Sequence, residues 1–192
     1  MKIGLYFGTF NPIHIGHLTI ANHLAEHSDL DKIWFVVTPH SPFKKKSSLL
    51  DNRQRFEMVY RATEDYLKLE PSDIEFNLPQ PNYTINTLTH LQEKYPSHTF
   101  SLIMGEDNLN NFHKWKNYDI ILEHHHIYCY PRISNGKTDT QVKGHPKIHL
   151  VNAPIMELSS TFIRQSIKDN KNVRPMLPEH VWDYLDDMNF YK

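Results

Sequence analysis

Short runs of apolar, β-branched and aromatic residues recur along the chain and are mostly separated by stretches with helical spacing. Runs of this kind are typical of buried strands, and their alternation with helices predicts a parallel sheet. The predicted strands have the sequences KIGLYF, KIWFVV, TFSLIM, HIYCY and KIHLV. The pattern therefore predicts an open α/β sheet of the doubly wound, Rossmann-like type, in which ligands bind at the carboxyl ends of the strands.

The clearest helical pattern runs from about Asp51 to Leu69, and Asp51 with Gln54 resembles a capping box at its start. One apolar stripe follows this segment at helical spacing and consists of Phe56, Val59, Ala62, Tyr66 and Leu69. We therefore expect an amphipathic helix over these residues, packed on the sheet.

Two further helices are predicted closer to the end of the chain. One follows Thr84 and places Ile85, Leu88, Leu91 and Tyr95 on one face. The other begins at Pro178, which suits a first helical position, and carries Val181, Leu185 and Met188 at helical spacing. Residues 131–146 are polar and rich in turn formers, so they predict a surface loop. We expect the last helices to close one end of the fold.

The size and composition of the chain narrow its class. A length of 192 residues fits one domain spanning residues 1–192. The charges nearly cancel, with 21 Lys and Arg against 22 Asp and Glu, so we expect neither a nucleic acid nor a membrane as partner. The single cysteine, Cys129, allows no internal disulfide, and the chain opens on a strand pattern where a signal peptide would need a long apolar stretch. These features favour a cytoplasmic protein.

The segment GTFNPIHIGH, residues 8–17, follows the first predicted strand directly. Gly8 can adopt backbone angles that other residues avoid, and Gly16 lacks a side chain where a ligand could approach a helix start. His14 and His17 lie one turn apart and can both donate hydrogen bonds to one polyphosphate. The alternative is a capped turn with two histidines facing solvent.

A second candidate anion site lies in LSSTFIRQSI, where hydroxyl side chains precede a helix. Ser159, Ser160 and Thr161 can cap this helix, and Arg164 follows Thr161 by about one turn. The planar guanidinium of arginine matches phosphate oxygens. A well-capped helix with an exposed arginine explains the segment equally well.

Together, GTFNPIHIGH and SSTFIR resemble the paired signature of the nucleotidyltransferase superfamily, and within it the nicotinate-nucleotide adenylyltransferases. The likeness extends to PNYTINTL, IMGEDNLNNFHKW and LPEHVWDYL, in the family's order. It implies adenylyl transfer from ATP to nicotinate mononucleotide, which gives nicotinate adenine dinucleotide and pyrophosphate for NAD biosynthesis, with Mg²⁺ carried by ATP.

The resemblance also implies roles for individual residues. His14, His17 and Arg164 would form the catalytic group, with His17 stabilising charge on the reacting phosphate. The residues expected to bind ATP are Gly8, Thr9, Phe10, Gly16, Gly105, Asp107, Ser160 and Thr161. Those expected to bind the mononucleotide are Lys44, Tyr83, Thr84 and Trp115. Read without the family, Trp115 is a half-buried packing residue among charges.

The chain departs from the family pattern at two places. Asn11 stands where bacterial members often have Asp, so we assign no metal-binding or basic carboxylate there. Phe43 stands where the family usually has His directly before Lys, which leaves open which of Lys44, Lys45 and Lys46 meets phosphate.

Several alternatives remain open from the sequence. The run EHHH, Glu123 to His126, lacks a second ligand cluster at helpful spacing, so we predict a structural role and no metal site. Pantetheine-phosphate adenylyltransferases and cytidylyltransferases share the first motif, and a class I aminoacyl-tRNA synthetase uses a similar element. Nicotinamide mononucleotide is an alternative substrate, although we expect preference for the acid. A nucleotide-binding regulator without turnover is the non-enzymatic alternative, and a homo-oligomer is possible.

Overall fold

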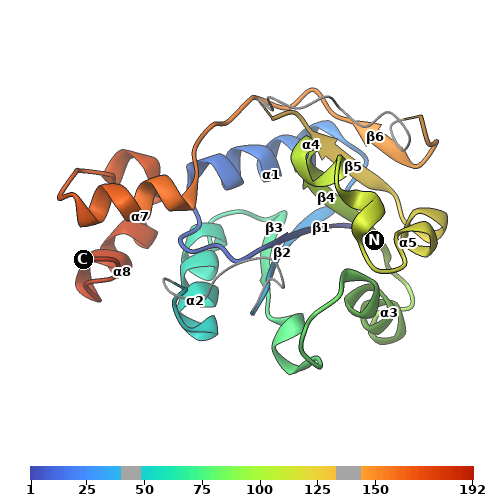
Figure 1. Cartoon of the computed structure of the whole chain (residues 1–192), viewed down its shortest axis with the longest axis horizontal. Helices are drawn as coiled ribbons and strands as arrows, with labels where there is room; N and C mark the ends of the chain where they lie inside the picture. The colour runs from blue at the N-terminus through green and yellow to red at the C-terminus, as the bar shows by residue number, and fades with distance from the viewer. Residues whose placement is uncertain (40–48, 133–143) are drawn as a thin grey trace.

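The computed structural model describes residues 1–39, 49–132 and 144–192. Its centre is one sheet of six strands in the order β3-β2-β1-β4-β5-β6, and every neighbouring pair is parallel (Figure 1). The strands are β1 (Lys2–Gly8), β2 (Lys32–Val37), β3 (Leu69–Ser72), β4 (Thr99–Gly105), β5 (Ile127–Tyr130) and β6 (Ile148–Leu150).

The strand order identifies where a ligand site belongs in this sheet. Successive strands run outward from β1 to β3 in one direction and from β4 to β6 in the other, so the order reverses between β1 and β4. In open parallel sheets the crevice for ligands lies at such a reversal, beyond the carboxyl ends of the strands. Those ends are Gly8 of β1 and Gly105 of β4.

Helices cover both faces of the sheet and form a further group at one end (Figure 1). The α-helices are α1 (Ile15–His27), α2 (Asn52–Thr63), α3 (Thr84–Lys94), α4 (Glu106–Leu109), α5 (Tyr118–His124), α7 (Ser160–Lys168) and α8 (Glu179–Asp187). The short 3₁₀ turns are η1 (Ile74–Asn77), η2 (Phe112–Lys114) and η3 (Arg174–Met176). Within the described ranges, none of the helices combines the length and the apolar character needed to cross a bilayer.

Two apolar cores lie on opposite faces of the sheet. In β1, Ile3 and Leu5 belong to the core under α3 and α5, whereas Tyr6 belongs to the core under α1, α2, α7 and α8. Side chains alternate across a strand, and a strand buried on both faces therefore reads as a continuous apolar run. This explains why KIGLYF and KIWFVV are recognisable in the sequence.

The five predicted strands are confirmed, but the sixth, β3, was not predicted. β3 has the sequence LEPS and pairs only with β2, at the edge of the sheet. An edge strand tolerates Pro71 because one side of its backbone needs no hydrogen-bonded partner. Four residues with a proline and a glutamate carry no apolar pattern.

The helix predicted from Asp51 to Leu69 begins where it was expected, but it ends before the predicted last residue. Asp51 and Gln54 form the capping box, but α2 stops at Thr63. The Thr63 hydroxyl donates to the carbonyl of Val59 at 2.9 Å, inside the last turn. Leu69, although it lies in register with the helical stripe, begins β3. The predicted end was wrong because a turn and a strand continued the spacing by coincidence.

The other two predicted helices are present as α3 and α8. Pro178 is the N-cap of α8 and Glu179 is its first residue, so the predicted start is displaced by one position. Val181 and Leu185 are fully buried, whereas Met188 lies beyond the helix and is 48% exposed. The predicted loop at 131–146 falls largely outside the described residues.

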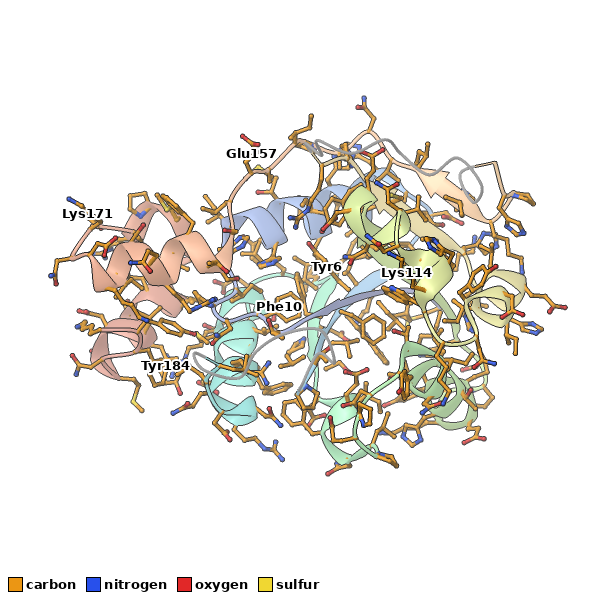
Figure 2. The ribbon with its side chains drawn as sticks, in the orientation of Figure 1. Tyr6, Phe10, Lys114, Glu157, Lys171 and Tyr184 are labelled. Atoms are coloured by element: carbon orange, nitrogen blue, oxygen red, sulfur yellow. The ribbon has the colours of Figure 1, made fainter. Side chains whose placement is uncertain are left out.

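The C-terminal helices α7 and α8 pack beside α2 at one end of the molecule (Figure 1). Figure 2 shows Tyr184 of α8 directed toward α2, where the guanidinium carbon of Arg61 is 4.7 Å from its ring centroid. This end group brings the second predicted motif, at the start of α7, next to the first.

Candidate active site

The turn after β1 packs an aromatic ring beneath the first motif. Phe10 is 2% exposed, and its ring lies edge-on to the rings of Tyr6, Phe35 and His17, with a centroid distance of 5.2 Å to His17. Figure 2 shows Tyr6 and Phe10 in the interior of the molecule. The buried ring of Phe10 therefore packs against the His17 ring and helps to hold it in position.

The expected role of Gly8 needs correction. No described glycine has a positive φ, and the left-handed residue of this turn is Phe10, with φ 45°. A Cβ atom on Gly8 would lie 2.7 Å from Cζ of Phe10, which is too close. Gly8 is thus needed for the space that the Phe10 ring occupies. The next residue, Thr9, accepts a hydrogen bond from Arg55 through its backbone carbonyl.

His14 is the N-cap of α1 and is almost completely buried, at 3% exposed. Gly16 leaves room for its ring, because a Cβ there would lie 3.1 Å from His14 Nδ1. That nitrogen has no hydrogen-bond partner among the described residues. Burial, followed by the nearby charge of Arg132, lowers the pKa of His14 to about 4. His14 is therefore neutral at pH 7 and can act on a phosphate only as a hydrogen-bonding group.

The two histidines of the first motif lie together, as their spacing predicts. Their rings stack with centroids 3.7 Å apart and planes 21° apart. The backbone N–H of His14 donates to Nδ1 of His17 at 3.3 Å. A neutral His17 then carries its ring proton on Nε2. The backbone thus fixes the tautomer in which His17 offers a donor from its outer nitrogen.

The start of α7 is bonded directly to the first motif across the chain. Ser159 is the N-cap, and its hydroxyl accepts from Phe162 N at 3.2 Å, as the sequence predicts. Ser160 donates its hydroxyl to the carbonyl of Pro12 at 2.8 Å. The structure therefore brings these two motifs, more than 140 residues apart, into one site.

Arg164 adds the second link between the motifs. Its Nη1 donates to the carbonyl of Asn11 at 2.7 Å, and its Nη2 donates to the Thr161 hydroxyl at 3.3 Å. The guanidinium is thus oriented by protein groups before any ligand binds. Such preorganisation lowers the cost of aligning a charged group with a phosphate.

Asn11 holds the same turn from its other side. It is 3% exposed and precedes a cis peptide bond to Pro12. Its Oδ1 accepts from the hydroxyl of Tyr191 at 2.6 Å and from Leu50 N at 3.3 Å. The side chain that departs from the family pattern therefore ties the first motif to the C-terminus and to the start of α2.

Arg55, which sequence reasoning missed, is fully buried next to this turn. Its guanidinium makes five hydrogen bonds, one of them to Asn52 Oδ1 at 2.7 Å. The other four go to the backbone carbonyls of Thr9, Thr38, Pro39 and Leu50. Burial lowers the pKa of Arg55 to about 10. Its helical position among polar neighbours gave no signal of this role.

Asp107 follows β4 and faces a second arginine that was not predicted. Oδ1 of Asp107 lies 3.8 Å from Nε of Arg132, just after β5. A Cβ on Gly105 would lie 2.5 Å from the same carboxylate oxygen, so a side chain at this position would displace the Asp107 carboxylate. Arg132 also donates to the hydroxyl of Tyr130 at 3.4 Å. A cation at the carboxyl end of a parallel strand was the signal that could have found it.

Of the predicted mononucleotide residues, Tyr83 and Thr84 lie at the start of α3. Tyr83 is the N-cap and Thr84 the first residue, and the Tyr83 side chain makes no cap hydrogen bond. Trp115 is half-buried and packs on Phe112, with ring centroids 5.4 Å apart. Lys116 Nζ lies 4.4 Å from the centroid of the Tyr83 ring. The segment that carries Trp115 is therefore adjacent to the α3 start.

The buried carboxyl group of Glu75 stabilises the residues on either side of the α3 start. Glu75 in η1 is 2% exposed, and its Oε1 accepts from the Thr87 hydroxyl at 2.7 Å. Its backbone carbonyl accepts from Asn82 Nδ2 at 3.2 Å. Burial raises the pKa of Glu75, against the opposing effect of the Thr87 hydrogen bond. Glu75 thus links η1 to both flanks of the α3 start.

The EHHH run lies far from this site, at the amino end of the sheet. His124 ends α5, His125 is its C-cap, and His126 donates to or accepts from His149 at 2.8 Å. The predicted strand HIYCY starts at His126, whereas β5 begins one residue later, at Ile127. His124, His125 and His126 line a separate hollow of about 830 Å³ between α3 and α5.

Two further points concern charged residues of the site. In residues 1–39, 49–132 and 144–192, no three His, Cys, Asp or Glu side chains are grouped so that they could hold a metal ion. Lys44, Lys45 and Lys46 lie outside the described residues.

Comparison with known proteins shows which family the chain is similar to. The family model described as cytidylyltransferase-like matches residues 5–166. A protein of Flavobacterium johnsoniae named "Probable nicotinate-nucleotide adenylyltransferase" is 68% identical over 192 residues, covering 100% of both chains. A protein of Christiangramia forsetii with the same name is 68% identical over 191 residues, covering 100% of this chain and 98% of the relative.

A solved structure shares the fold at much lower identity. It is the Plasmodium falciparum nicotinic acid mononucleotide adenylyltransferase complexed with NaAD, with a TM-score of 0.80 and 19% identity. The match covers 99% of this chain and 97% of the other, so it supports the architecture over the full length. From the family model and the two close relatives, the chain belongs to the nicotinate-nucleotide adenylyltransferases of the cytidylyltransferase-like family.

Proposed function

We infer that the chain transfers an adenylyl group from ATP to nicotinate mononucleotide, giving nicotinate adenine dinucleotide and pyrophosphate in NAD biosynthesis. We further propose that residues 1–192 act as one nucleotidyltransferase domain, located in the cytoplasm. The observation that carries the proposal is the joining of two anion-binding motifs at the reversal point of the sheet, through Ser160 and Arg164.

The reaction requires no covalent bond between the protein and its substrates. A phosphate oxygen of the mononucleotide attacks the α-phosphorus of ATP, and the bond from that phosphorus to the bridging oxygen breaks. Pyrophosphate leaves with the electron pair. The nucleophile is already an anion, so no general base is required, and catalysis is alignment plus stabilisation of developing charge.

The first motif suits that task. His17 is fixed with its proton on Nε2, which allows it to donate to the oxygen on which charge develops. His14, neutral and buried against it, excludes water from the same end of α1. The helix start adds backbone N–H groups and a positive dipole end. We assign the reacting phosphate to this position.

The charged residues complete the phosphate site. Arg164 contacts the triphosphate from α7, with Thr161 and Ser160 beside it, and Arg132 adds a cation near His14. Gly105 and Asp107 at the end of β4 face the adenosine, and one of Lys44, Lys45 and Lys46 meets phosphate. Mg²⁺ arrives with ATP and keeps most of its waters.

The ring of the mononucleotide belongs at the α3 start. Tyr83 and Thr84 line its pocket, and Trp115 stacks on the pyridine. Because the N-cap residue Tyr83 makes no side-chain cap hydrogen bond, the first N–H groups of α3 suit the ring carboxylate. An amide would turn an NH₂ group toward donors that it cannot satisfy, which costs about ten- to a hundredfold in specificity.

A pyrophosphate-release assay with ATP and each mononucleotide tests the function. We expect turnover with both and a higher kcat/KM for the acid. Absence of turnover with either, in folded protein that binds ATP, would favour a nucleotide-binding regulator. Equal kcat/KM values, or a preference for the amide, would contradict the assignment to nicotinate mononucleotide.

A further inference from the structure

Lys116 is a cation in contact with Tyr83, one of the residues predicted to bind the mononucleotide. Its ammonium lies 4.4 Å from the centroid of the Tyr83 ring, in a cation–π arrangement between two segments 33 residues apart. Lys116 directly follows Trp115, and Tyr83 directly precedes Thr84. The pair therefore places a positive charge where the two segments assigned to the pyridine ring meet.

The charge of Lys116 is not neutralised by the protein in the described part of the chain, where it forms no ion pair with a carboxylate. Its near neighbour Lys114 differs, because Nζ of Lys114 donates to Asn111 Oδ1 at 2.8 Å within its own turn. Both side chains are exposed. Only Lys116 is oriented toward the α3 start.

The same location has a second positive influence. α3 has eleven residues, and the side chain of its N-cap residue, Tyr83, makes no cap hydrogen bond. The ammonium of Lys116 lies over the ring of this N-cap residue, so the ammonium and the helix dipole both add positive potential near the α3 start. An anion there is attracted by both, whereas a neutral group of the same shape gains little from either.

We propose that Lys116 is a specificity-determining residue, whose ammonium, held over Tyr83, favours the ring carboxylate of nicotinate mononucleotide over the amide. The proposal rests on the proposed function and adds a side-chain charge to the backbone donors of α3. Because the pair is exposed, its contribution is small, about three- to fivefold in the ratio of kcat/KM values.

Lys116→Met tests the proposal, because methionine keeps an unbranched stem that can pack on Tyr83 and removes only the charge. We expect kcat/KM for nicotinate mononucleotide to fall about three- to fivefold, and kcat/KM for the amide and KM for ATP to stay unchanged. Lys116→Arg should restore the ratio. Lys114→Met, with the same change of charge two residues away, is the matched control and should leave the ratio unaltered.

Salt gives a second readout. Exposed charge pairs are screened as ionic strength rises, so the preference of the unmodified protein for the acid should narrow more in high salt than that of Lys116→Met. If Lys116→Met weakens both mononucleotides equally, Lys116 only holds two segments together and the proposal is overturned. An equal shift of the ratio in Lys114→Met also overturns it.

The outcomes separate this proposal from the function on which it rests. Turnover by the unmodified protein with an unaltered ratio in Lys116→Met would refute the role of Lys116 alone. Absence of turnover in the unmodified protein would refute the function. In that case calorimetric binding of each mononucleotide to both proteins decides about Lys116, and an equal affinity difference between acid and amide in both would refute its role.

Discussion

The phosphate end and the ring end of the candidate site are built in different ways. At the phosphate end, Ser160, Arg164 and Asn11 join segments more than 140 residues apart through hydrogen bonds of 2.6–2.8 Å. At the ring end, the exposed Lys116 lies over the Tyr83 ring, and the neighbouring Trp115 packs on Phe112. The difference indicates that the first end is prepared for alignment and charge, and the second for adjustable recognition.

That contrast makes separate predictions for rate and for selectivity. Changes at the phosphate end should lower turnover or ATP binding for both mononucleotides alike. Changes at the ring end should alter mononucleotide affinity with little effect on ATP.

The largest effect is expected for His17→Ala. It removes a preorganised donor at the reacting phosphate, and loss of one such donor lowers kcat by about 10²–10³. His17 is only half-buried, so the thermal midpoint should change little. Steady-state pyrophosphate release measures kcat, and calorimetric unfolding checks the fold. A kcat within about twofold of the unmodified protein would remove His17 from the mechanism.

The second prediction concerns stability at acid pH. His14 has a folded pKa of about 4, below its ordinary value of 6.5, so the unfolded chain binds more protons between those values. The free energy of unfolding should therefore fall as pH drops from about 6.5 to 4, with a contribution of up to about 3 kcal/mol from this group.

Denaturant unfolding across this pH range measures that loss. His14→Asn is the matched variant, because asparagine is a good N-cap and does not titrate. Other histidines with lowered pKa values, such as His125, titrate in both proteins, so the difference between the two curves isolates His14. Parallel curves would contradict the assignment.

Arg164→Ala should weaken ATP binding by about ten- to a hundredfold, because hydrogen bonds to charged groups contribute about 1.5–3 kcal/mol. The change also removes the bond to the Asn11 carbonyl, so kcat should fall as well. Calorimetric titration with ATP measures the affinity. An unaltered ATP affinity would mean that the start of α7 has only a structural role.

The smallest effect of the series is expected at the ring end. Trp115→Ala should raise KM for nicotinate mononucleotide by about tenfold through loss of stacking, with KM for ATP unchanged. Trp115→Phe, which keeps an aromatic ring, should recover most of this loss. If KM for ATP rises equally, Trp115 acts by packing on Phe112 and the contrast between the two ends fails.

Much of the sheet could be predicted from the sequence because β1, β2 and β4 are buried on both faces. Hydrophobic burial leaves a pattern that can be read directly. β3 could not be predicted, because an edge strand with Pro71 has no such pattern. The end of α2 was misplaced because Tyr66 and Leu69 continued the helical spacing beyond Thr63.

The site likewise contains residues that the sequence could predict and residues that it could not. Glycines, histidines and hydroxyls clustered in two short segments marked the phosphate end. Arg55 and Glu75 are single polar residues whose importance comes from contacts made only after folding, so neighbouring residues gave no signal. The contact of Lys116 with Tyr83 is also of this kind.

The hydrogen bonds of Arg55 have a consequence for sequence variation among relatives. Four of its five acceptors are main-chain carbonyls, which every amino acid supplies. Substitutions at Thr9, Thr38 or Leu50 leave those acceptors in place, whereas lysine at position 55 would offer three donors from a single nitrogen. We therefore expect arginine at this position to persist through lineages in which the residues around it have been exchanged.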